Sequence, residues 1–231
     1  MAKWALVSDF DGTASLTDVG DAIVRTYAGP KAWREVDGAI RRGELTTKGA
    51  YEVVYDRIRV SAAELGEFVL RFPLDPHFAA AAELFARYGL PAVIVSDGFD
   101  FYIDRLLARA ALTWLPRFCN HLEIAGTRPQ VSFPYHGALA CHRCANCKTY
   151  HLERLKAQGY SIVYLGDGHT DRCAARQADL VFAKGYLASF LAQRGVPFHP
   201  FQYFADTLPR LRALLTWSEE SPADGACATG E

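Results

Sequence analysis

Three short apolar runs, each ended abruptly by acidic, glycine and hydroxyl residues, constrain the fold of this chain most strongly. The runs are WALVSD at residues 4–9, PAVIVS at 91–96 and SIVYL at 161–165. A short apolar run bounded in this way is typical of a buried strand, and a further strand is predicted at 179–183. Helical segments alternate with these strands. The alternation predicts an α/β, Rossmann-like fold: a mostly parallel sheet with helices on both faces.

The stretch between the first two runs carries no strand signal. Val19, Ile23 and Tyr27 repeat at helical spacing, and Ser61 with Glu64 forms a capping box. We therefore expect a Rossmann-like core over residues 1–15 and 73–217 and an all-helical insertion over 16–72. A disordered tail is expected over 218–231, which lacks apolar periodicity. Further helices are predicted at 76–88 (capped by Asp75), 99–112, 148–158, 169–177, 186–194 and 203–216.

Composition excludes several classes of partner. Among 231 residues, 25 Lys and Arg balance 26 Asp and Glu, so no bulk charge attracts nucleic acid or anionic lipid. No run reaches the ~18 apolar residues of a membrane span. The start, MAKWALVSDFDG, is too short and too acidic for a signal peptide. We expect a cytoplasmic monomer or homodimer that binds neither nucleic acid nor membranes.

Polar clusters at the ends of the predicted strands indicate a binding site. Ligands of an open parallel sheet bind at the carboxyl ends of its strands, which brings Asp9, Asp11, Asp167 and Asp171 to one edge. Two carboxylates ~4 Å apart repel by about 4 kcal/mol at an effective dielectric of 20. Oxygen ligands suit Mg²⁺, and Lys148 can supply further positive charge. Each cluster alone is more often a set of turn and helix-cap residues; three on one edge favour a site.

The order of these motifs resembles a known family. The DFDGT start, Ser96, Lys148 and the GDG-x-T-D loop resemble the four motifs of the haloacid dehalogenase superfamily. The helical insertion resembles the cap of its phosphoserine phosphatase branch. The cysteine-rich stretch before Lys148 and the segment around Phe99 to Tyr102 resemble the methionine-salvage phosphatases within that branch. The resemblance implies a Mg²⁺-dependent phosphomonoesterase that acts on a small-molecule phosphate ester through an aspartyl-phosphate.

The resemblance also implies roles for individual residues. Asp9 is then the nucleophile, Asp11 protonates the leaving oxygen and later activates water, Ser96 hydrogen-bonds the phosphate, and Lys148 neutralises Asp9 and the phosphoryl oxygens. Elementary electrostatics agrees with these roles. A phosphate dianion near one carboxylate is repelled by roughly 8 kcal/mol on the same scale, so a carboxylate nucleophile needs cations beside it.

The metal ligands and the loop after the second strand follow from the same resemblance. Asp9, Asp167 and the main-chain carbonyl of Asp11 are expected to hold Mg²⁺, and Asp171 orients either Lys148 or a metal-bound water.

The phosphate-binding loop departs from the branch at one position. Asp97 and Gly98 follow Ser96, and the branch usually carries glycine where this chain has Asp97. Such a carboxylate would repel phosphate unless it points away.

Asp18 and three aromatic residues of the predicted cap have two interpretations each. Asp18 stands where the branch carries an acidic residue for the substrate amine, and it is equally a carboxylate in the first turn of a helix. Trp33, Tyr51 and Tyr55 could line a substrate pocket, although aromatic residues at helical spacing are more often core.

Other functions remain open at this point. Cys141, Cys144 and Cys147, with His142 and His151 nearby, could bind Zn²⁺, but buried reduced cysteines also serve as small apolar residues. A phosphotransferase with the same intermediate is a second enzyme hypothesis. A phospho-receiver domain or a zinc-dependent interaction module is a non-enzyme hypothesis; the receiver fits poorly, because such domains need only ~100–150 residues.

Overall fold

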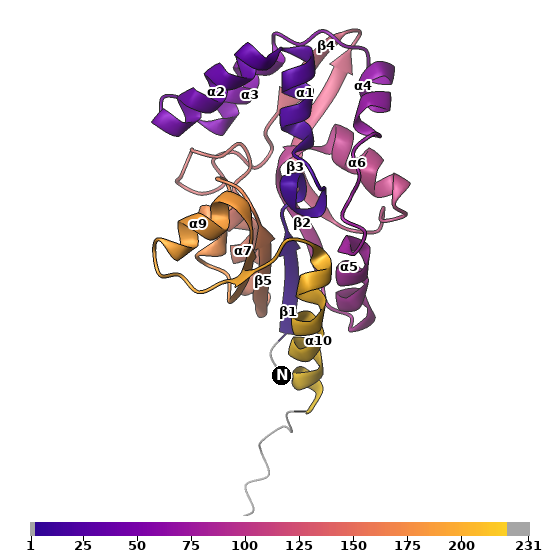
Figure 1. Cartoon of the computed structure of the whole chain (residues 1–231), viewed down its shortest axis with the longest axis vertical. Helices are drawn as coiled ribbons and strands as arrows, with labels where there is room; N and C mark the ends of the chain where they lie inside the picture. The colour runs from indigo at the N-terminus through magenta and orange to yellow at the C-terminus, as the bar shows by residue number, and fades with distance from the viewer. Residues whose placement is uncertain (1–2, 221–231) are drawn as a thin grey trace, which may run out of the picture.

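A mostly parallel sheet forms the centre of the computed structural model, which describes residues 3–220 (Figure 1). Its seven described strands have the order β4-β3-β2-β1-β5-β6-β7. Every neighbouring pair is parallel except β3 and β4, which form an antiparallel hairpin at one edge. The strands are β1 (Lys3–Ser8), β2 (Ala92–Phe99), β3 (Arg117–Ala125), β4 (Arg128–Ser132), β5 (Tyr160–Gly166), β6 (Leu180–Ala183) and β7 (His199–Pro200). The predicted α/β fold is confirmed.

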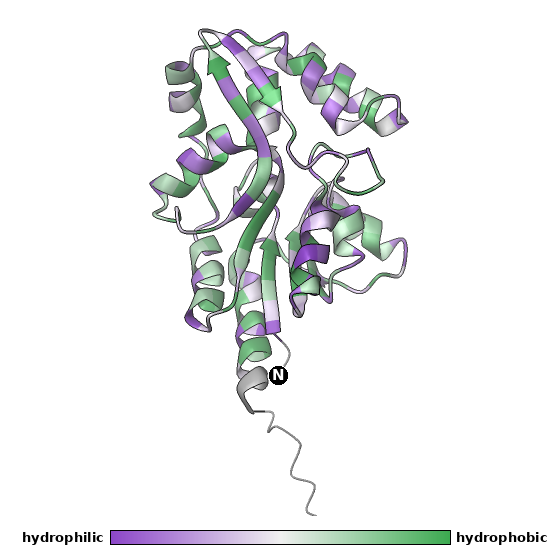
Figure 2. Ribbon diagram, turned by 180° about the vertical axis from the view of Figure 1, so that it is seen from behind, coloured by the Kyte–Doolittle hydropathy of each residue, from purple (hydrophilic) through white to green (hydrophobic). Residues whose placement is uncertain are grey.

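Helices cover both faces of the sheet because its central strands are apolar on both sides. Side chains alternate along β1: Leu6 faces one buried cluster, and Ala5 and Val7 face another. The first cluster includes residues of α5 (Phe78–Arg87), α6 (Asp100–Arg109) and α10 (Phe204–Glu220). The second includes residues of α7 (Lys148–Ala157), α8 (Arg172–Ala175) and α9 (Gly185–Ala192). Green and purple both appear on the helices in Figure 2, as expected of amphipathic helices.

Of the α-helices that the structure describes between β1 and β2, the four before α5 stand beyond the carboxyl ends of the strands in Figure 1. They are α1 (Val19–Tyr27), α2 (Pro30–Arg42), α3 (Thr47–Tyr55) and α4 (Ala62–Val69). The Oγ of Ser61 accepts a hydrogen bond from the amide of Glu64 at 3.2 Å, as the capping box predicts. Buried apolar side chains of these helices continue into the cluster on the sheet. The division into cap and catalytic core stays a proposal.

The structure corrects several predicted boundaries. Helix α5 begins at Phe78 rather than Pro76, and the turn before it is held by Asp75. Its two carboxylate oxygens accept hydrogen bonds from the amides of His77 (2.8 Å) and Phe204 (2.9 Å), which ties α5 to α10. The helix predicted at 169–177 is reduced to the short α8. Of the predicted tail, residues 218–220 belong to the end of α10, and 221–231 lie outside the described residues.

The second strand is also longer than its apolar run. Strand β2 continues through Ser96 to Phe99, and its register with β3 shifts between Val95 and Phe99. A register shift of this kind re-aims side chains at the end of a strand. Within residues 3–220, no helix is long and apolar enough to cross a bilayer.

Candidate active site

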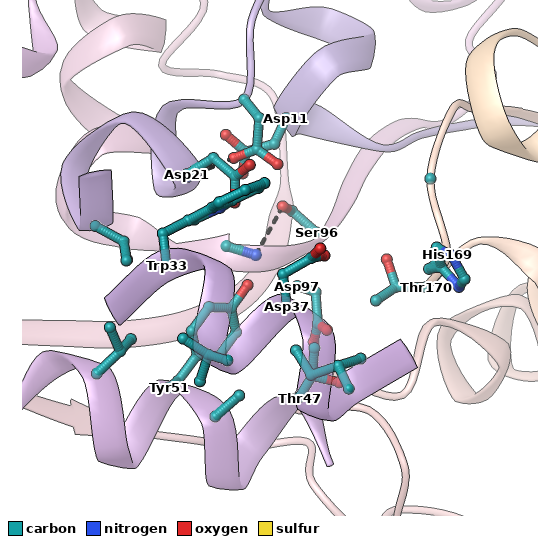
Figure 3. Close-up of a pocket in the computed structure, with 18 of the residues that line it drawn as sticks. Asp11, Asp21, Trp33, Asp37, Thr47, Tyr51, Ser96, Asp97, His169 and Thr170 are labelled. Atoms are coloured by element: carbon teal, nitrogen blue, oxygen red, sulfur yellow. Dashed lines mark hydrogen bonds between the residues drawn. The ribbon is translucent and has the colours of Figure 1, made fainter. Parts of the chain in front are cut away.

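The ends of three adjacent parallel strands and the helices above them line a cavity of about 210 Å³ (Figure 3). Because β2, β1 and β5 are neighbours, Ser96, Asp9 and Asp167 meet at one edge of the sheet. Helices α1, α2 and α3 supply the opposite wall, which includes Trp33 and Tyr51. The structure therefore brings the predicted strand-end residues together around one cavity.

Lys148 joins two carboxylates at the base of the site. Its Nζ lies 2.7 Å from Oδ1 of Asp9 and 2.6 Å from Oδ1 of Asp171. The lysine is only 2% exposed. Burial alone lowers the pKa of Lys148, but the neighbouring Asp171 and Asp9 outweigh it, so the pKa lies above its ordinary value. Lys148 is therefore a fixed positive charge beside Asp9.

Asp171 is fully occupied by hydrogen bonds. Its Oδ1 accepts from Lys148 and from the hydroxyl of Tyr164, both at 2.6 Å. Its Oδ2 accepts from the amides of Asp167 at 3.0 Å and Gly168 at 2.8 Å. Burial raises the pKa of Asp171, but Lys148 and the hydrogen bonds outweigh burial and hold the pKa below its usual range. These contacts fit the alternative in which Asp171 orients Lys148.

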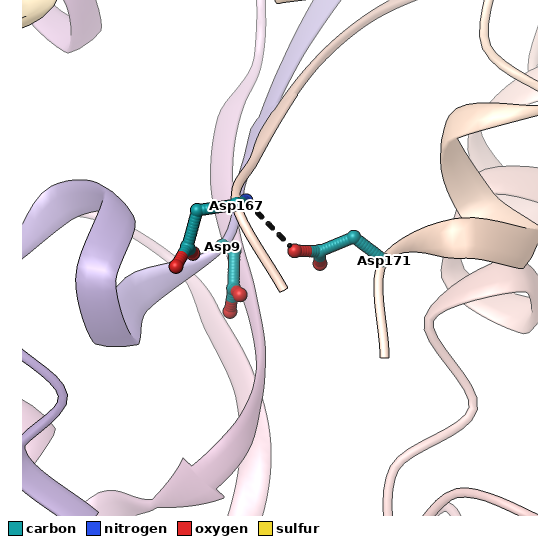
Figure 4. A group of neighbouring side chains, drawn as sticks. All are labelled: Asp9, Asp167 and Asp171. Carbon is teal, nitrogen blue, oxygen red and sulfur yellow. Dashed lines mark hydrogen bonds between the residues drawn. The ribbon is translucent and has the colours of Figure 1, made fainter. Parts of the chain in front are cut away.

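Asp9, Asp167 and Asp171 form the one group in residues 3–220 that could hold a metal ion, with ligand oxygens all within 4.8 Å of one another (Figure 4). Oδ1 of Asp9 also accepts a hydrogen bond from the amide of Phe10 at 2.7 Å. The pKa of Asp9 is raised by burial and by Asp171. Burial and Asp171 likewise raise the pKa of Asp167 to about 6. Three carboxylates facing one ammonium leave excess negative charge, which a divalent cation would neutralise.

The turn after β1 brings the backbone close to this group. Gly12 has a φ of +70°, and a Cβ there would lie 2.4 Å from Oδ2 of Asp167. Thr13, one residue on, donates its hydroxyl to Oδ1 of Asp167 at 2.7 Å. Only glycine fits at position 12, and the threonine orients a carboxylate of the candidate metal group.

Asp11 also lines the cavity and is held by both of its carboxylate oxygens. Oδ1 accepts from the amide of Val19 at 2.9 Å, and Oδ2 accepts from the hydroxyl of Tyr102. Burial raises the pKa of Asp11 to about 6, although the Tyr102 hydrogen bond opposes it. A Cβ on Gly98 would lie 1.9 Å from the Tyr102 oxygen and 2.4 Å from Oδ2 of Asp11. Glycine is therefore required where β2 passes over this pair.

Asp97 lines the cavity, and one of its carboxylate oxygens is held by a backbone amide. Its Oδ1 accepts from the amide of Asn146 at 2.5 Å, whereas its buried Oδ2 has no hydrogen-bond partner. Burial raises the pKa of Asp97 to about 6. Ser96 beside it accepts the amide hydrogen of Gly98 at 3.0 Å through Oγ, so its hydroxyl proton remains to be donated. Asp97 thus has one oxygen in use and one unsatisfied.

Helix α1 begins at the edge of the cavity. Oδ1 of Asp18 accepts from the amide of Asp21 at 2.7 Å, so Asp18 caps the helix and also lines the cavity. Trp33 and Tyr51 line the cavity too. Tyr55 is buried and packs against Phe99, with ring centroids 4.8 Å apart. The pocket interpretation thus holds for Trp33 and Tyr51, and the core interpretation for Tyr55.

The predicted zinc site is not supported. In the described part of the chain, Cys141, Cys144 and Cys147 belong to no group of metal-ligating side chains with ligand atoms within 4.8 Å. His151 hydrogen-bonds Asn146 instead of a metal. The cysteine spacing was therefore misleading.

Four side chains of the site escaped the sequence analysis. Tyr102, Tyr164 and Asn146 contact Asp11, Asp171 and the Ser96 loop from distant parts of the chain. Thr13 lies in the first motif but was given no role. Tyr102 falls in a segment that the family resemblance had marked, whereas Tyr164 is hidden in an apolar run and Asn146 in the cysteine-rich stretch.

Comparison with known proteins agrees with the fold and the motifs. A family model described as "Putative Phosphatase" matches residues 4–197. The chain is 28% identical over 216 residues to the 2-hydroxy-3-keto-5-methylthiopentenyl-1-phosphate phosphatase of Exiguobacterium sibiricum, covering 92% of this chain and 98% of that protein. It is 29% identical over 213 residues to the enzyme of the same name from Geobacillus kaustophilus, covering 90% and 96%.

Solved structures share the fold. A phospho-aspartyl intermediate analogue of phosphoserine phosphatase superimposes with a TM-score of 0.69 at 16% identity, over 91% of this chain and 99% of that one. A probable phosphoserine phosphatase from Vibrio cholerae gives a TM-score of 0.69 at 22% identity, over 95% of this chain and 67% of that one.

Proposed function

Because this chain belongs to the phosphatases of the haloacid dehalogenase superfamily, we propose that it hydrolyses a small phosphate monoester in two steps, through an aspartyl-phosphate on Asp9 and with Mg²⁺ as cofactor. The observation that carries the proposal is the position of Lys148, whose Nζ lies 2.7 Å from Oδ1 of Asp9 and 2.6 Å from Oδ1 of Asp171. A carboxylate can attack a phosphate dianion only where positive charge screens both, and Lys148 is held where it screens Asp9.

The two steps share one acid–base group. In the first, a carboxylate oxygen of Asp9 bonds to phosphorus, the ester P–O bond breaks, and Asp11 gives its proton to the leaving oxygen. In the second, Asp11 takes a proton from a water that attacks phosphorus, and the bond to Asp9 breaks to release phosphate. A pKa of about 6 for Asp11 supports both roles, because protonated and ionised forms are both populated near neutral pH.

The carboxylates present fit a magnesium ion. Asp9, Asp167 and the main-chain carbonyl of Asp11 would hold it, since Asp171 already uses both oxygens on four donors. When bound, Mg²⁺ supplies two positive charges that offset the negative charge of the phosphoryl group. Thr13 would hold the Asp167 carboxylate in place for this purpose, and Gly12 leaves room for it.

The remaining residues bind and orient the phosphoryl group. Ser96 donates its hydroxyl to a phosphoryl oxygen, Gly98 leaves room for Asp11 and Tyr102, and Asp171 orients Lys148. Asp97 keeps Oδ1 on the Asn146 amide, which turns that oxygen from the phosphate.

The acidic lining of the cavity favours a leaving group that carries an amine. Of the described residues that line it, none is lysine or arginine, and the carboxylates are Asp9, Asp11, Asp18, Asp21, Asp37, Asp97 and Asp167. Lys148 and Mg²⁺ offset those nearest the phosphoryl group. An ammonium on the leaving group would offset part of the charge on the cap side, where Asp18 lies.

A screen of small phosphate esters with Mg²⁺ tests the proposal. We expect release of phosphate from amino-bearing esters, and loss of more than ~10³-fold in Asp9→Asn. Asp104→Asn is the matched control, since Asp104 is paired with Arg117 on the surface. Mass spectrometry of acid-quenched enzyme should find phosphate on the peptide that contains Asp9. Activity within tenfold in Asp9→Asn would refute the aspartyl-phosphate. Transfer of phosphate to an added alcohol would favour the phosphotransferase.

A further inference from the structure

We propose that Asn146 is a positioning residue that fixes the Ser96–Asp97 segment of this site against the segment that carries Lys148. His151 orients the side-chain amide of Asn146. The inference rests on the proposed function, in which Ser96 binds the phosphoryl group. Asn146 lies two residues before Lys148 and is fully buried. It touches neither Asp9 nor Lys148 in any hydrogen bond described, and it acts through its neighbours.

Each polar atom that Asn146 directs toward the end of β2 has a partner there. Its backbone N–H donates to Oδ1 of Asp97 at 2.5 Å. Its Nδ2 donates to the carbonyl of Ser96 at 2.7 Å and to the carbonyl of Phe118 at 2.8 Å. These bonds reach β2 and β3 where the register between the two strands shifts. Asn146 thereby ties the end of β2 and the start of β3 to the segment that carries Lys148.

The orientation of the Asn146 amide is determined by its surroundings. Nδ2 faces two carbonyl oxygens, which only accept, so Nδ2 must be the donor end. Oδ1 then faces Nε2 of His151 at 2.9 Å, which makes that nitrogen the protonated one. The Nδ1 of His151 is buried without a partner, as expected of a neutral ring. Burial lowers the pKa of His151 to about 4, which keeps the ring neutral at ordinary pH.

Aromatic packing holds the histidine in place. The His151 ring stacks on Phe118 with centroids 4.7 Å apart and meets Tyr135 edge-on at 4.5 Å. It stands one turn into α7, the helix that Lys148 begins. A segment of six residues, 146–151, thus carries Asn146, Lys148 and His151. A shift of the Ser96 hydroxyl relative to Lys148 requires breaking this network, so the two phosphate-binding groups are held as one unit.

A double-mutant cycle on inorganic phosphate tests the inference. The enzyme with Mg²⁺ is assayed for the Ki of inorganic phosphate as competitive inhibitor, for KM and for kcat. Unfolding in urea is measured alongside. In Asn146→Ala we expect Ki and KM to rise about tenfold, the scale of a lost buried hydrogen bond. In Ser96→Ala the same Asn146→Ala change should alter Ki by less than about twofold, because Asn146 acts through Ser96. A purely structural role lowers stability and gives independent, additive effects on Ki.

A second pair of variants keeps the test decisive if Asn146→Ala does not fold. His151→Phe retains the stacked ring but removes the donor to Oδ1 of Asn146, and it should raise Ki several-fold. His151→Gln restores an N–H donor and should return Ki toward the wild-type value. Equal Ki for wild type and His151→Phe, or additive effects in the cycle, overturn the inference and leave the proposed function intact. An unchanged Ki in Ser96→Ala alone overturns the inference together with the phosphate-binding role given to Ser96.

Discussion

Tyr102→Phe should move the pH dependence of this enzyme to higher pH. The Tyr102 hydroxyl donates to Oδ2 of Asp11, and it favours the ionised carboxylate. The ring is fully buried and phenylalanine keeps its shape, so the change removes little besides the hydrogen bond. Oδ1 of Asp11 retains the Val19 amide at 2.9 Å. The pKa of Asp11, raised to about 6 by burial, should therefore rise further.

The size of the shift follows from the bond that is lost. A hydrogen bond to a charged group contributes about 1.5–3 kcal/mol, and one pKa unit corresponds to about 1.36 kcal/mol. The pKa of Asp11 should therefore rise by about 1–2 units. Formation of the aspartyl-phosphate needs Asp11 protonated, so kcat/KM is high below this pKa and falls above it. The falling limb should move up by the same amount.

Profiles of kcat/KM against pH for both enzymes on one substrate check this, because ionisation of the substrate phosphate is common to both. Tyr55→Phe is the matched control: Tyr55 is equally buried, and its hydroxyl has no hydrogen-bond partner. Its profile should coincide with that of wild type. An unchanged limb in Tyr102→Phe, or one displaced to lower pH, would refute the role assigned to Asp11.

Three further predictions concern the charges of the site. Lys148→Met should abolish activity and lower the free energy of unfolding in urea by about 3–5 kcal/mol, because Asp9 and Asp171 stay buried without their cation. Lys156→Met, at an exposed position, should lower the free energy of unfolding by less than about 1 kcal/mol. Equal losses in the two variants would contradict this prediction. Chelation should stop phosphate release, Mg²⁺ should restore it and Ca²⁺ should not, since Ca²⁺ prefers 6–8 ligands and binds carboxylates through both oxygens; full activity with Ca²⁺ would count against the site. Asp18→Ala should raise KM about 10–100-fold for amino-bearing phosphates and leave neutral ones unchanged, besides costing about 0.5–2 kcal/mol as a helix cap. Steady-state kinetics on one ester of each kind decides, and an equal effect on both would remove amine recognition.

Residues close in sequence specified much of this protein. The apolar runs that became β1, β2, β5 and β6, and the clusters at the ends of three of them, could be recognised because strand periodicity and turn chemistry act over a few residues. Parallel pairing then places the ends of adjacent strands at one edge, which is why Asp9, Ser96 and Asp167 could be expected to meet. The capping box at Ser61 was likewise a local signal.

Contacts between distant segments decided the rest. Tyr102 reaches Asp11 across 91 positions, and Asn146 reaches Ser96 across 50. Asp75, which local rules assign to a helix cap, is instead buried between two helices that begin 126 positions apart, at Phe78 and Phe204. The zinc-like cysteine spacing failed for the same reason, since ligands need convergence in space. Local spacing sets the direction of a side chain along its own element, whereas the packing of elements sets its partners, and only the folded chain brings donor, acceptor and burial together.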